Sequence, residues 1–180
     1  LMHDQRAARA GFDLAAASEV DTDVHLGDWK LVRKGDNFIA WIAGREIGFA
    51  LEFRPTQPLL LQGQGGVSSK GPKPGQASCY YSLPHLAVSG SITVKDRTLE
   101  VLGSAWMDHE WSSEALAPEA EGWDWVGLNL ADGAALMAFR IRTRDGSAFW
   151  AGGTYRSADG RVRVLRPQEV EFHPTRHWRS

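Results

Sequence analysis

The stretch WDWVGLNLADGAALMAFRIRTRDGSAFWAGGTYRSADG, residues 123–160, decides the fold, because turn and strand signals repeat along it at near-equal spacing. Asp132-Gly133, Asp145-Gly146 and Asp159-Gly160 each separate apolar or alternating segments. Asp-Gly favours a two-residue hairpin turn, since both central residues of such a turn need positive φ. The stretch therefore predicts a meander that suits an up-and-down barrel, with strands at 123–131, 134–144, 147–157 and 161–172.

The first hairpin of this meander assigns side chains to two faces. A two-residue turn at Asp132-Gly133 places Asp124 opposite Ile141, on the same apolar face as Met137 and Phe139. An ionised carboxylate alone on such a face is costly. Asp124 is therefore either a general acid that its surroundings keep protonated, or a structural group bonded to a backbone amide, a Trp or a His. The residues alone leave both interpretations open.

The run WMDHEW at residues 106–111 supplies the histidine nearest to these carboxylates. Alternation along a strand groups Met107, His109 and Trp111 on the more apolar face and sends the two carboxylates of the run to the other face or the rim. We therefore expect His109 to lie within a hydrogen bond, or one bridging water, of Asp124.

The predicted site consists of a catalytic pair, His109 and Asp124, inside an aromatic cavity. Aromatic rings beside His and Asp can wall a pocket for a flat apolar ligand, although a barrel core with a few satisfied polar groups has the same composition. The predicted ligand-binding residues are Tyr81, Trp106, Met107, Trp111, Met137, Phe139 and Trp150.

The rest of the chain supports an all-β fold with a short extension before it. Residues 1–20 contain two alanine-rich runs that predict short helical turns, interrupted by Gly11. From Val24 onward, short apolar runs bounded by Gly, Asp and Pro are typical of antiparallel strands. Residues 62–78 are rich in Gly and Pro and predict a long loop at the mouth of a barrel; they lack the spacing of a phosphate-binding loop. The predicted fold class is an antiparallel calycin or lipocalin-like barrel, or a strongly curved sheet.

Composition excludes several classes of function. The 180 residues carry a formal net charge of -2, which indicates neither nucleic-acid binding nor an anionic membrane surface. Cys79 is the one cysteine, so an intramolecular disulfide and a cysteine-based metal site are both excluded. The histidines lack metal-ligand spacing, and we expect neither a metal nor a cofactor. No apolar run reaches the length of a transmembrane segment.

Three motifs resemble a known family. These are YYSLP at residues 80–84, GSAWMDHEWSS at 103–113, and GWDW at 122–125 followed by Asp132-Gly133. Together they resemble the AttH-like family, a lipocalin-like group that also includes carotenoid 1,2-hydratase (hydroxyneurosporene synthase), predicted secreted hydrolases of bacteria and relatives of fungal pericyclases. The resemblance runs from about Asp28 to the end, which gives an extension at 1–27 and a β-domain at 28–180.

The resemblance implies a barrel that holds an apolar isoprenoid or polyketide-like ligand. In the hydratases of the family, acid–base residues protonate an isolated double bond without a cofactor. Members usually carry two such β-domains in tandem, so the expected partners are a second β-domain or a second copy of the chain. The resemblance also implies a bacterial protein and leaves export open.

Three functions follow from these observations. The first is a cofactor-independent lyase (hydratase) or isomerase, in which Asp124 protonates a C=C bond, His109 orients it or activates water, and Trp111 stabilises the cation. The second is a lipocalin-like carrier that uses the same cavity without chemistry. The third, a secreted hydrolase, lacks the Gly-x-Ser-x-Gly motif of the serine hydrolases.

Overall fold

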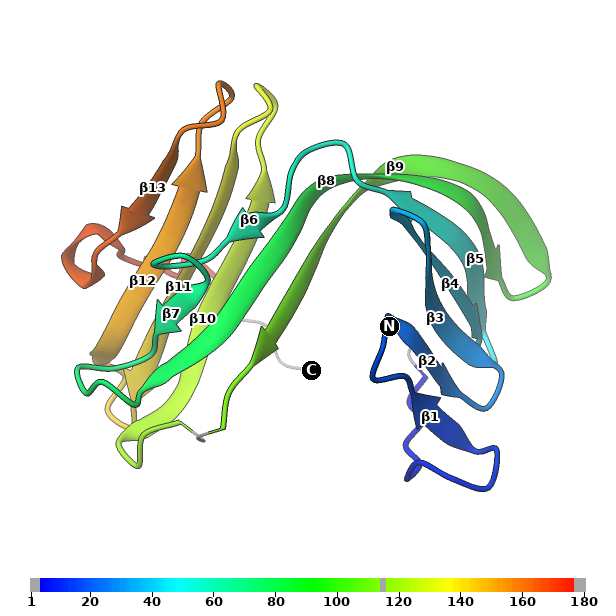
Figure 1. The fold of residues 1–180 in the computed structure, drawn as a ribbon, viewed down its shortest axis with the longest axis horizontal. Coiled ribbons are helices and arrows are strands. Elements are labelled where there is room, and N and C mark those ends of the chain that lie inside the picture. Colours follow the sequence, from blue (N-terminus) through cyan, green and yellow to red (C-terminus); the bar gives the residue numbers. More distant parts are fainter. Residues whose placement is uncertain (1–3, 114–115, 177–180) are drawn as a thin grey trace. The chain divides into compact units, whose positions relative to one another are not determined.

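The computed structural model describes residues 4–113 and 116–176, and these form antiparallel strands with one short 3-10 helix (Figure 1). The contacts divide the chain into two compact units, residues 4–56 with 86–105, and residues 57–85 with 106–113 and 116–176. No helix in the described part of the chain is long and apolar enough to cross a membrane. The predicted antiparallel all-β class is confirmed. Of the two predicted forms, the structure has the curved sheet, because the described strands do not close into a barrel.

The first unit is an antiparallel sheet of consecutive strands. β1 (Ala15–Ala17), β2 (Asp23–Leu26), β3 (Trp29–Lys34), β4 (Asn37–Ala43) and β5 (Ile47–Arg54) pair in chain order. The later part of β8 (Ala77–Val94) pairs with β5, and β9 (Arg97–Trp111) pairs with β8. β8 and β9 are long enough to contribute to both units.

The N-terminal segment differs from the sequence prediction of short helical turns within residues 1–20. Residues 4–20 contain no helix, and the backbone of Gly11, Phe12 and Asp13 has positive φ, outside the right-handed helical region. The Leu14 amide instead closes a turn onto the Gly11 carbonyl at 3.0 Å, and β1 follows. The predicted helical turns are therefore wrong for the described residues.

The second unit has two layers with its core between them. β6 (Leu60–Leu61) and β7 (Val67–Ser69) pair with the first part of β8, and β7 is a short strand inside the predicted loop 62–78. β10 (Ala120–Asn129), β11 (Ala135–Thr143), β12 (Ala148–Arg156) and β13 (Val162–Leu165) form the predicted meander. Tyr80 of β8 packs with Met137, Phe139 and Ile141 of β11 in the buried core.

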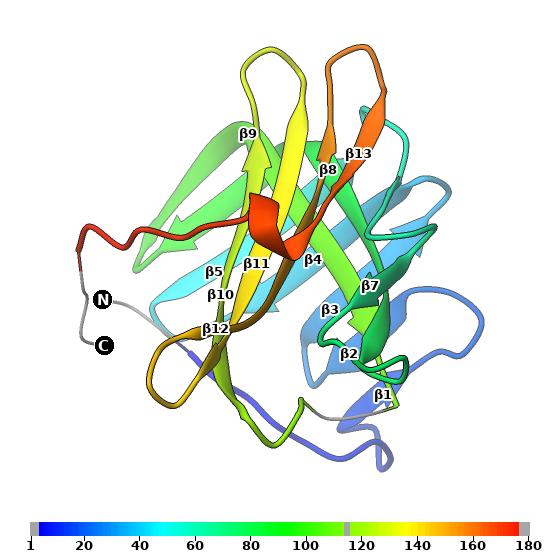
Figure 2. The same cartoon turned by 90° about the vertical axis from the view of Figure 1, so that its left-hand side faces the viewer.

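A 3-10 helix, η1 (Pro167–Glu169), follows β13 and packs against β12 (Figure 2). Its neighbouring C-terminal segment reaches Arg140, whose guanidinium lies 5.8 Å from the centre of the Phe172 ring and donates to the Phe172 carbonyl at 3.4 Å. The segment therefore contacts a side chain on the face of β11 that is turned away from the core.

Each hairpin of the meander has one more loop residue than the sequence predicted. The Gly133 amide donates to the Leu130 carbonyl at 3.0 Å, and the Leu130 amide donates to the Ala134 carbonyl at 2.9 Å. This is a type I turn followed by a glycine with positive φ, a three-residue loop for which Asp-Gly is equally suited. The turns at Gly146 and Gly160 repeat the same two hydrogen bonds.

The extra loop residue shifts the register by one and exchanges the faces of β10. Asp124 pairs with Arg140 instead of Ile141, and Trp125 pairs with Phe139. The predicted placement of Asp124 on the core face is therefore wrong, because a one-residue slip turns every side chain of a strand to the other face. Trp123 and Trp125 take the positions on the core side of β10, where they remain 61% and 43% exposed.

Gly146→Ala is expected to destabilise the protein by about 1–2 kcal/mol, because an L-residue is strained at positive φ. Gly146 has φ 83 and no neighbour within 4 Å of an added Cβ, so backbone strain alone is tested. Urea unfolding measures the change. Gly103→Ala is the control, since its added Cβ also meets nothing and its φ is not positive. An equal loss in both variants would contradict the turn assignment.

Candidate functional site

A cavity of about 260 Å³ opens in the second unit between β8, β9, β10 and β11. Its apolar wall consists mainly of aromatic rings and two branched aliphatic side chains, namely Trp111, Trp123, Trp125, Phe139, Leu116 and Ile141. Its polar groups come mainly from β8, β9 and the loop before β8, and include Lys70, Ser78, Tyr80 and Glu110. The cavity thus combines a flat apolar surface with a few convergent polar groups, as ligand pockets do.

Strand alternation explains which side chains reach the cavity. On β8, Ser78 and Tyr80 are two residues apart and share a face. On β10 and β11 the observed register pairs Trp123 with Ile141 and Trp125 with Phe139, so these four side chains also share a face.

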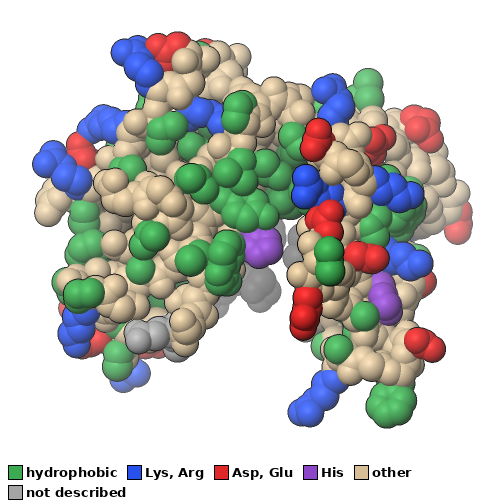
Figure 3. All heavy atoms as spheres, viewed as in Figure 1, with side chains coloured by type: hydrophobic (Ala, Val, Ile, Leu, Met, Phe, Trp, Pro, Cys, Tyr) green, Lys and Arg blue, Asp and Glu red, His purple; other side chains and the backbone are tan. Residues whose placement is uncertain are grey.

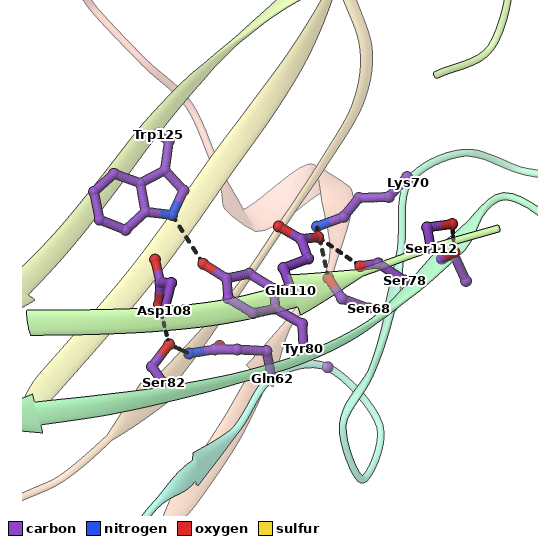
Figure 4. A network of polar contacts seen from close by, with 12 residues as sticks. Gln62, Ser68, Lys70, Ser78, Tyr80, Ser82, Asp108, Glu110, Ser112 and Trp125 are labelled. Atoms are coloured by element: carbon purple, nitrogen blue, oxygen red, sulfur yellow. Dashed lines mark hydrogen bonds and ion pairs between the residues drawn. The ribbon is translucent and has the colours of Figure 1, made fainter. Parts of the chain in front are cut away.

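The central polar feature is an ion pair between Lys70 and Glu110 (Figure 4). Lys70 Nζ lies 2.8 Å from Glu110 Oε1 and 3.1 Å from Ser68 Oγ, to which it donates. Ser78 Oγ donates to the same Glu110 oxygen at 2.5 Å. Both contacts to Glu110 fall on Oε1, so within the described residues Oε2 is the oxygen that remains open to a ligand or a water.

Aromatic rings surround the ammonium group of Lys70. Nζ lies 4.0 Å from the ring centre of Phe139 and 5.0 Å from that of Tyr80, within the range of cation–π attraction. Burial lowers the pKa of Lys70 below its usual value, and the Glu110 carboxylate opposes this shift. Lys70 is therefore a stronger acid than a lysine in water, and Glu110 keeps it charged.

Tyr80 links the cavity to a second polar chain behind it. Tyr80 Oη accepts a hydrogen bond from Trp125 Nε1 at 3.1 Å and lies near the Asp108 carboxylate. Burial raises the pKa of Tyr80, and the nearby charge of Asp108 raises it further. Tyr80 is 3% exposed and stays neutral, so it acts as a fixed hydrogen-bonding group at neutral pH.

Asp108 is the acceptor at the end of a row of hydrogen bonds that runs through Ser82 and Gln62 (Figure 4). Its Oδ1 accepts from Trp106 Nε1 at 2.7 Å and from Ser82 Oγ at 2.5 Å, and Ser82 Oγ accepts from Gln62 Nε2 at 2.7 Å. Trp125 and Trp106 are thus both fixed through their indole N–H groups, one by Tyr80 and the other by Asp108.

Gly127 supplies the space for these two indole rings. A Cβ at this position would lie 2.6 Å from Trp125 Cη2 and 2.9 Å from Trp106 Cε2, distances at which the rings would have to move. The glycine therefore lets both rings pack over the backbone of β10, and the hydrogen bonds of Tyr80 and Asp108 hold them there.

The structure does not bring the predicted catalytic pair together. Asp124 Oδ2 accepts from Arg140 Nε and Nη2 at 2.9 and 2.6 Å, and Oδ1 lies 3.3 Å from Arg142 Nε. His109 Nδ1 lies 3.3 Å from Tyr81 Oη, and its ring stacks on Tyr81. The predicted contact between His109 and Asp124 is wrong, because it depended on the two-residue turn that the hairpin does not form.

The predicted ligand-binding residues separate into three groups. Trp111 and Phe139 line the cavity. Met137 is fully buried in the core, and Trp106 and Trp150 pack against it. Tyr81 stacks with His109 in a ring cluster on the other face of β8, and Trp111 makes edge contacts with both rings. Met107 is half-buried without lining this cavity. Figure 3 shows hydrophobic side chains gathered around a histidine on the second unit.

Four polar residues of the cavity and its hydrogen-bond chain were missed by the sequence reasoning. Alternation along residues 106–111 had assigned Asp108 and Glu110 to the outer face or rim, because the neighbouring His109 and Trp111 looked more apolar. Lys70 lies in a glycine-rich loop, where the sequence offers no strand pattern to orient it. The signal that could have located Tyr80 is its neighbour Tyr81, since adjacent strand residues point to opposite faces.

Comparisons with known proteins agree with this fold. The family model described as AttH-like matches residues 1–180. A search of the curated proteins finds no match. A crystal structure described as AttH from Nitrosomonas europaea is similar with 51% identity and a TM-score of 0.93, over 99% of this chain and 56% of that one.

A second solved structure shows the fold alone. Kievitone hydratase from Nectria haematococca is similar with 18% identity and a TM-score of 0.68, over 84% of this chain and 48% of that one. The chain therefore spans about half the length of both solved structures.

Proposed function

Because this chain belongs to the AttH-like family, we propose that its cavity binds a flat, apolar small molecule and adds water to a C=C bond conjugated to a carbonyl group. The observation that carries the proposal is the Lys70–Glu110 ion pair inside an otherwise aromatic cavity. An acid and a base held 2.8 Å apart beside apolar walls are suited to proton transfer on a bound apolar molecule. Kievitone hydratase, which has a related fold, is by its name also a hydratase.

The carbonyl group gives Lys70 a defined role. An ammonium group has three N–H donors, and among the described residues two of those of Lys70 are directed to Glu110 and Ser68. The third is available to the carbonyl oxygen of the ligand, where negative charge develops as water adds to the double bond. A conjugated double bond needs this polarisation, whereas an isolated double bond would need a far stronger acid than an ammonium group.

Glu110 then serves as the base. Its Oε2 takes a proton from water as the water oxygen bonds to the β-carbon and the π electrons move to the carbonyl oxygen. Glu110 returns that proton to the α-carbon as the enolate collapses, so one C=C π bond breaks and one C–O and one C–H bond form. The ion pair is unchanged at the end of the cycle.

The aromatic walls hold the ligand in place for this step. Trp125 is fixed by Tyr80, and Phe139 is 5% exposed beneath Lys70. Flat rings on two strands favour a flat ligand and keep bulk water away from the enolate. The acid–base role thus moves from His109 and Asp124, the residues proposed from sequence, to Lys70 and Glu110.

Two other functions remain to be separated by experiment. A carrier without chemistry would use the same cavity and the same aromatic walls. A hydrolase would need an activated serine, but Ser78 and Ser82 donate to the carboxylates of Glu110 and Asp108. Within the described residues neither serine is hydrogen-bonded to a histidine, so the structure favours hydration or ligand carriage over hydrolysis.

The test uses β-ionone, a flat conjugated ketone, as the probe. Binding is measured by quenching of tryptophan fluorescence, and hydration by mass spectrometry after incubation in ¹⁸O-labelled water. Glu110→Gln is expected to lower turnover by about 10²–10⁴-fold while affinity changes little, because it removes the base and keeps the shape of the cavity.

Glu121→Gln is the matched control, because Glu121 is a surface carboxylate paired with Arg144 and should leave both measurements unchanged. If β-ionone quenches the fluorescence of the wild-type protein but no labelled product forms, the protein would be a carrier and not a hydratase. No quenching at all would refute it.

A further inference from the structure

A second cavity, of about 180 Å³, lies next to the first in the same unit. It is bounded by β7, β11, β12 and β13, and its walls include Ser68, Trp150, Gly152 and Leu165. These walls are mainly aromatic, aliphatic or glycine, so the second cavity also suits an apolar group.

One side chain, Phe139, lines both cavities. Lys70 Nζ lies 4.0 Å above its ring and donates to Ser68 Oγ, and Ser68 in turn lines the second cavity. The wall between the two cavities therefore contains the Phe139 ring, with the Lys70 side chain on the side of the proposed reaction.

The position of the Phe139 ring depends on a glycine in the neighbouring strand. Phe139 pairs with Gly152 of β12, and a Cβ at Gly152 would lie 3.3 Å from both Cε1 and Cζ of the Phe139 ring. A Cβ at Gly152 would therefore require the ring to shift by a few tenths of an ångström. The glycine admits the ring over β12, where it is 5% exposed.

We propose that Phe139 limits the length of the ligand by closing the end of the first cavity. The proposal rests on the proposed function and adds specificity to it: the natural ligand is a short, flat conjugated molecule, and longer apolar chains are excluded by one ring. The first cavity alone falls just below the usual range of about 300–1,000 Å³ for ligand pockets, whereas the two cavities joined would fall within it.

Phe139→Leu is expected to open a passage between the cavities and to admit longer chains. The probes are straight-chain conjugated enones of about eight to about eighteen carbons, measured by quenching of tryptophan fluorescence. Each methylene group newly removed from water raises affinity roughly fourfold. The affinity of the longest enone relative to the shortest should therefore rise by at least about tenfold in the variant.

Leu60→Val is the matched control. Leu60 of β6 is a buried core residue of the same unit, 1% exposed, and lines neither cavity. The control removes core volume without joining the cavities, so its length preference should equal that of the wild-type protein. Circular dichroism of each variant verifies that the strands are retained.

A second variant tests the same wall from the other side. Val164 of β13 lines only the second cavity, so Val164→Phe in the Phe139→Leu background should fill that cavity and restore the short preference.

A length preference in Phe139→Leu that matches the wild type, or an equal shift in Leu60→Val, would overturn the proposed role of Phe139. A wild-type protein that binds none of the enones would instead refute the proposed function, so the two failures are distinguishable.

Discussion

Lys70→Met and Glu110→Leu, made separately, should each destabilise the protein by about 1–3 kcal/mol, whereas the double variant should regain most of that loss. A single substitution leaves the other charge in the cavity without its partner. Breaking a fully buried pair costs about 3–5 kcal/mol. The side chains here are 19% and 37% exposed, and solvent screening reduces the effect.

Urea unfolding of the four proteins gives the coupling energy between the two residues. Arg144→Met, Glu121→Leu and their double variant form the control cycle, because this pair is 90% and 57% exposed, and its coupling should be much smaller. Additive losses at Lys70 and Glu110 would show that the pair does not act as a unit. The double variant should also lose the proposed hydration although it regains stability, because both the acid and the base are absent.

Tyr80→Phe should remove a large part of the loss of stability at alkaline pH. The raised pKa of Tyr80 means that the folded protein keeps this proton while the unfolded chain releases it near pH 10. The unfolded state then binds fewer protons, so the free energy of unfolding falls as pH rises, by about 1.4 kcal/mol per pH unit from this one group.

The free energy of unfolding should be measured above pH 10.5. Below this pH, Lys70 changes the stability with pH in the opposite direction to Tyr80. The lowered pKa of Lys70 makes stability rise with pH between that lowered value and the ordinary value of 10.5. Above 10.5 Lys70 no longer contributes to the slope. Burial also lowers the pKa of the Arg156 guanidinium, which opposes the slope of Tyr80 there but acts equally in both proteins, so Tyr80→Phe should show a shallower decline than the wild type. Tyr155→Phe on β12 is the control and should keep the wild-type slope. Parallel slopes in all three proteins would contradict the role assigned to Tyr80.

Tyr80→Phe also tests whether the Tyr80 hydroxyl fixes the ring of Trp125 in the cavity wall. Without the Tyr80 hydroxyl, Trp125 Nε1 loses its acceptor at 3.1 Å. We expect a loss of about 1–3 kcal/mol at neutral pH, because a buried polar group is left unsatisfied. Weaker quenching by β-ionone should accompany it, since the ring of Trp125 is no longer fixed.

The amino-acid sequence by itself determined the class of the fold and its most regular part. Three Asp-Gly pairs between alternating segments locate the hairpins of β10 to β13, because turn chemistry and the period of two are local properties. The Trp-rich motifs at 103–113 and 122–125 also indicated the family correctly. The N-terminal alanines were misleading, since helix propensity is weak beside the positive φ of Gly11, Phe12 and Asp13.

Only the tertiary structure decided which side chains form the site. Asp-Gly fits both a two-residue turn and the three-residue turn found here, and that single residue decides whether Asp124 or Trp125 faces the core. Lys70 meets Glu110 across 40 positions of sequence, from a loop without periodicity, so no local pattern could pair them. The hairpins follow from interactions between near neighbours in the chain, whereas the ion pair and the wall at Phe139 depend on how separate strands pack.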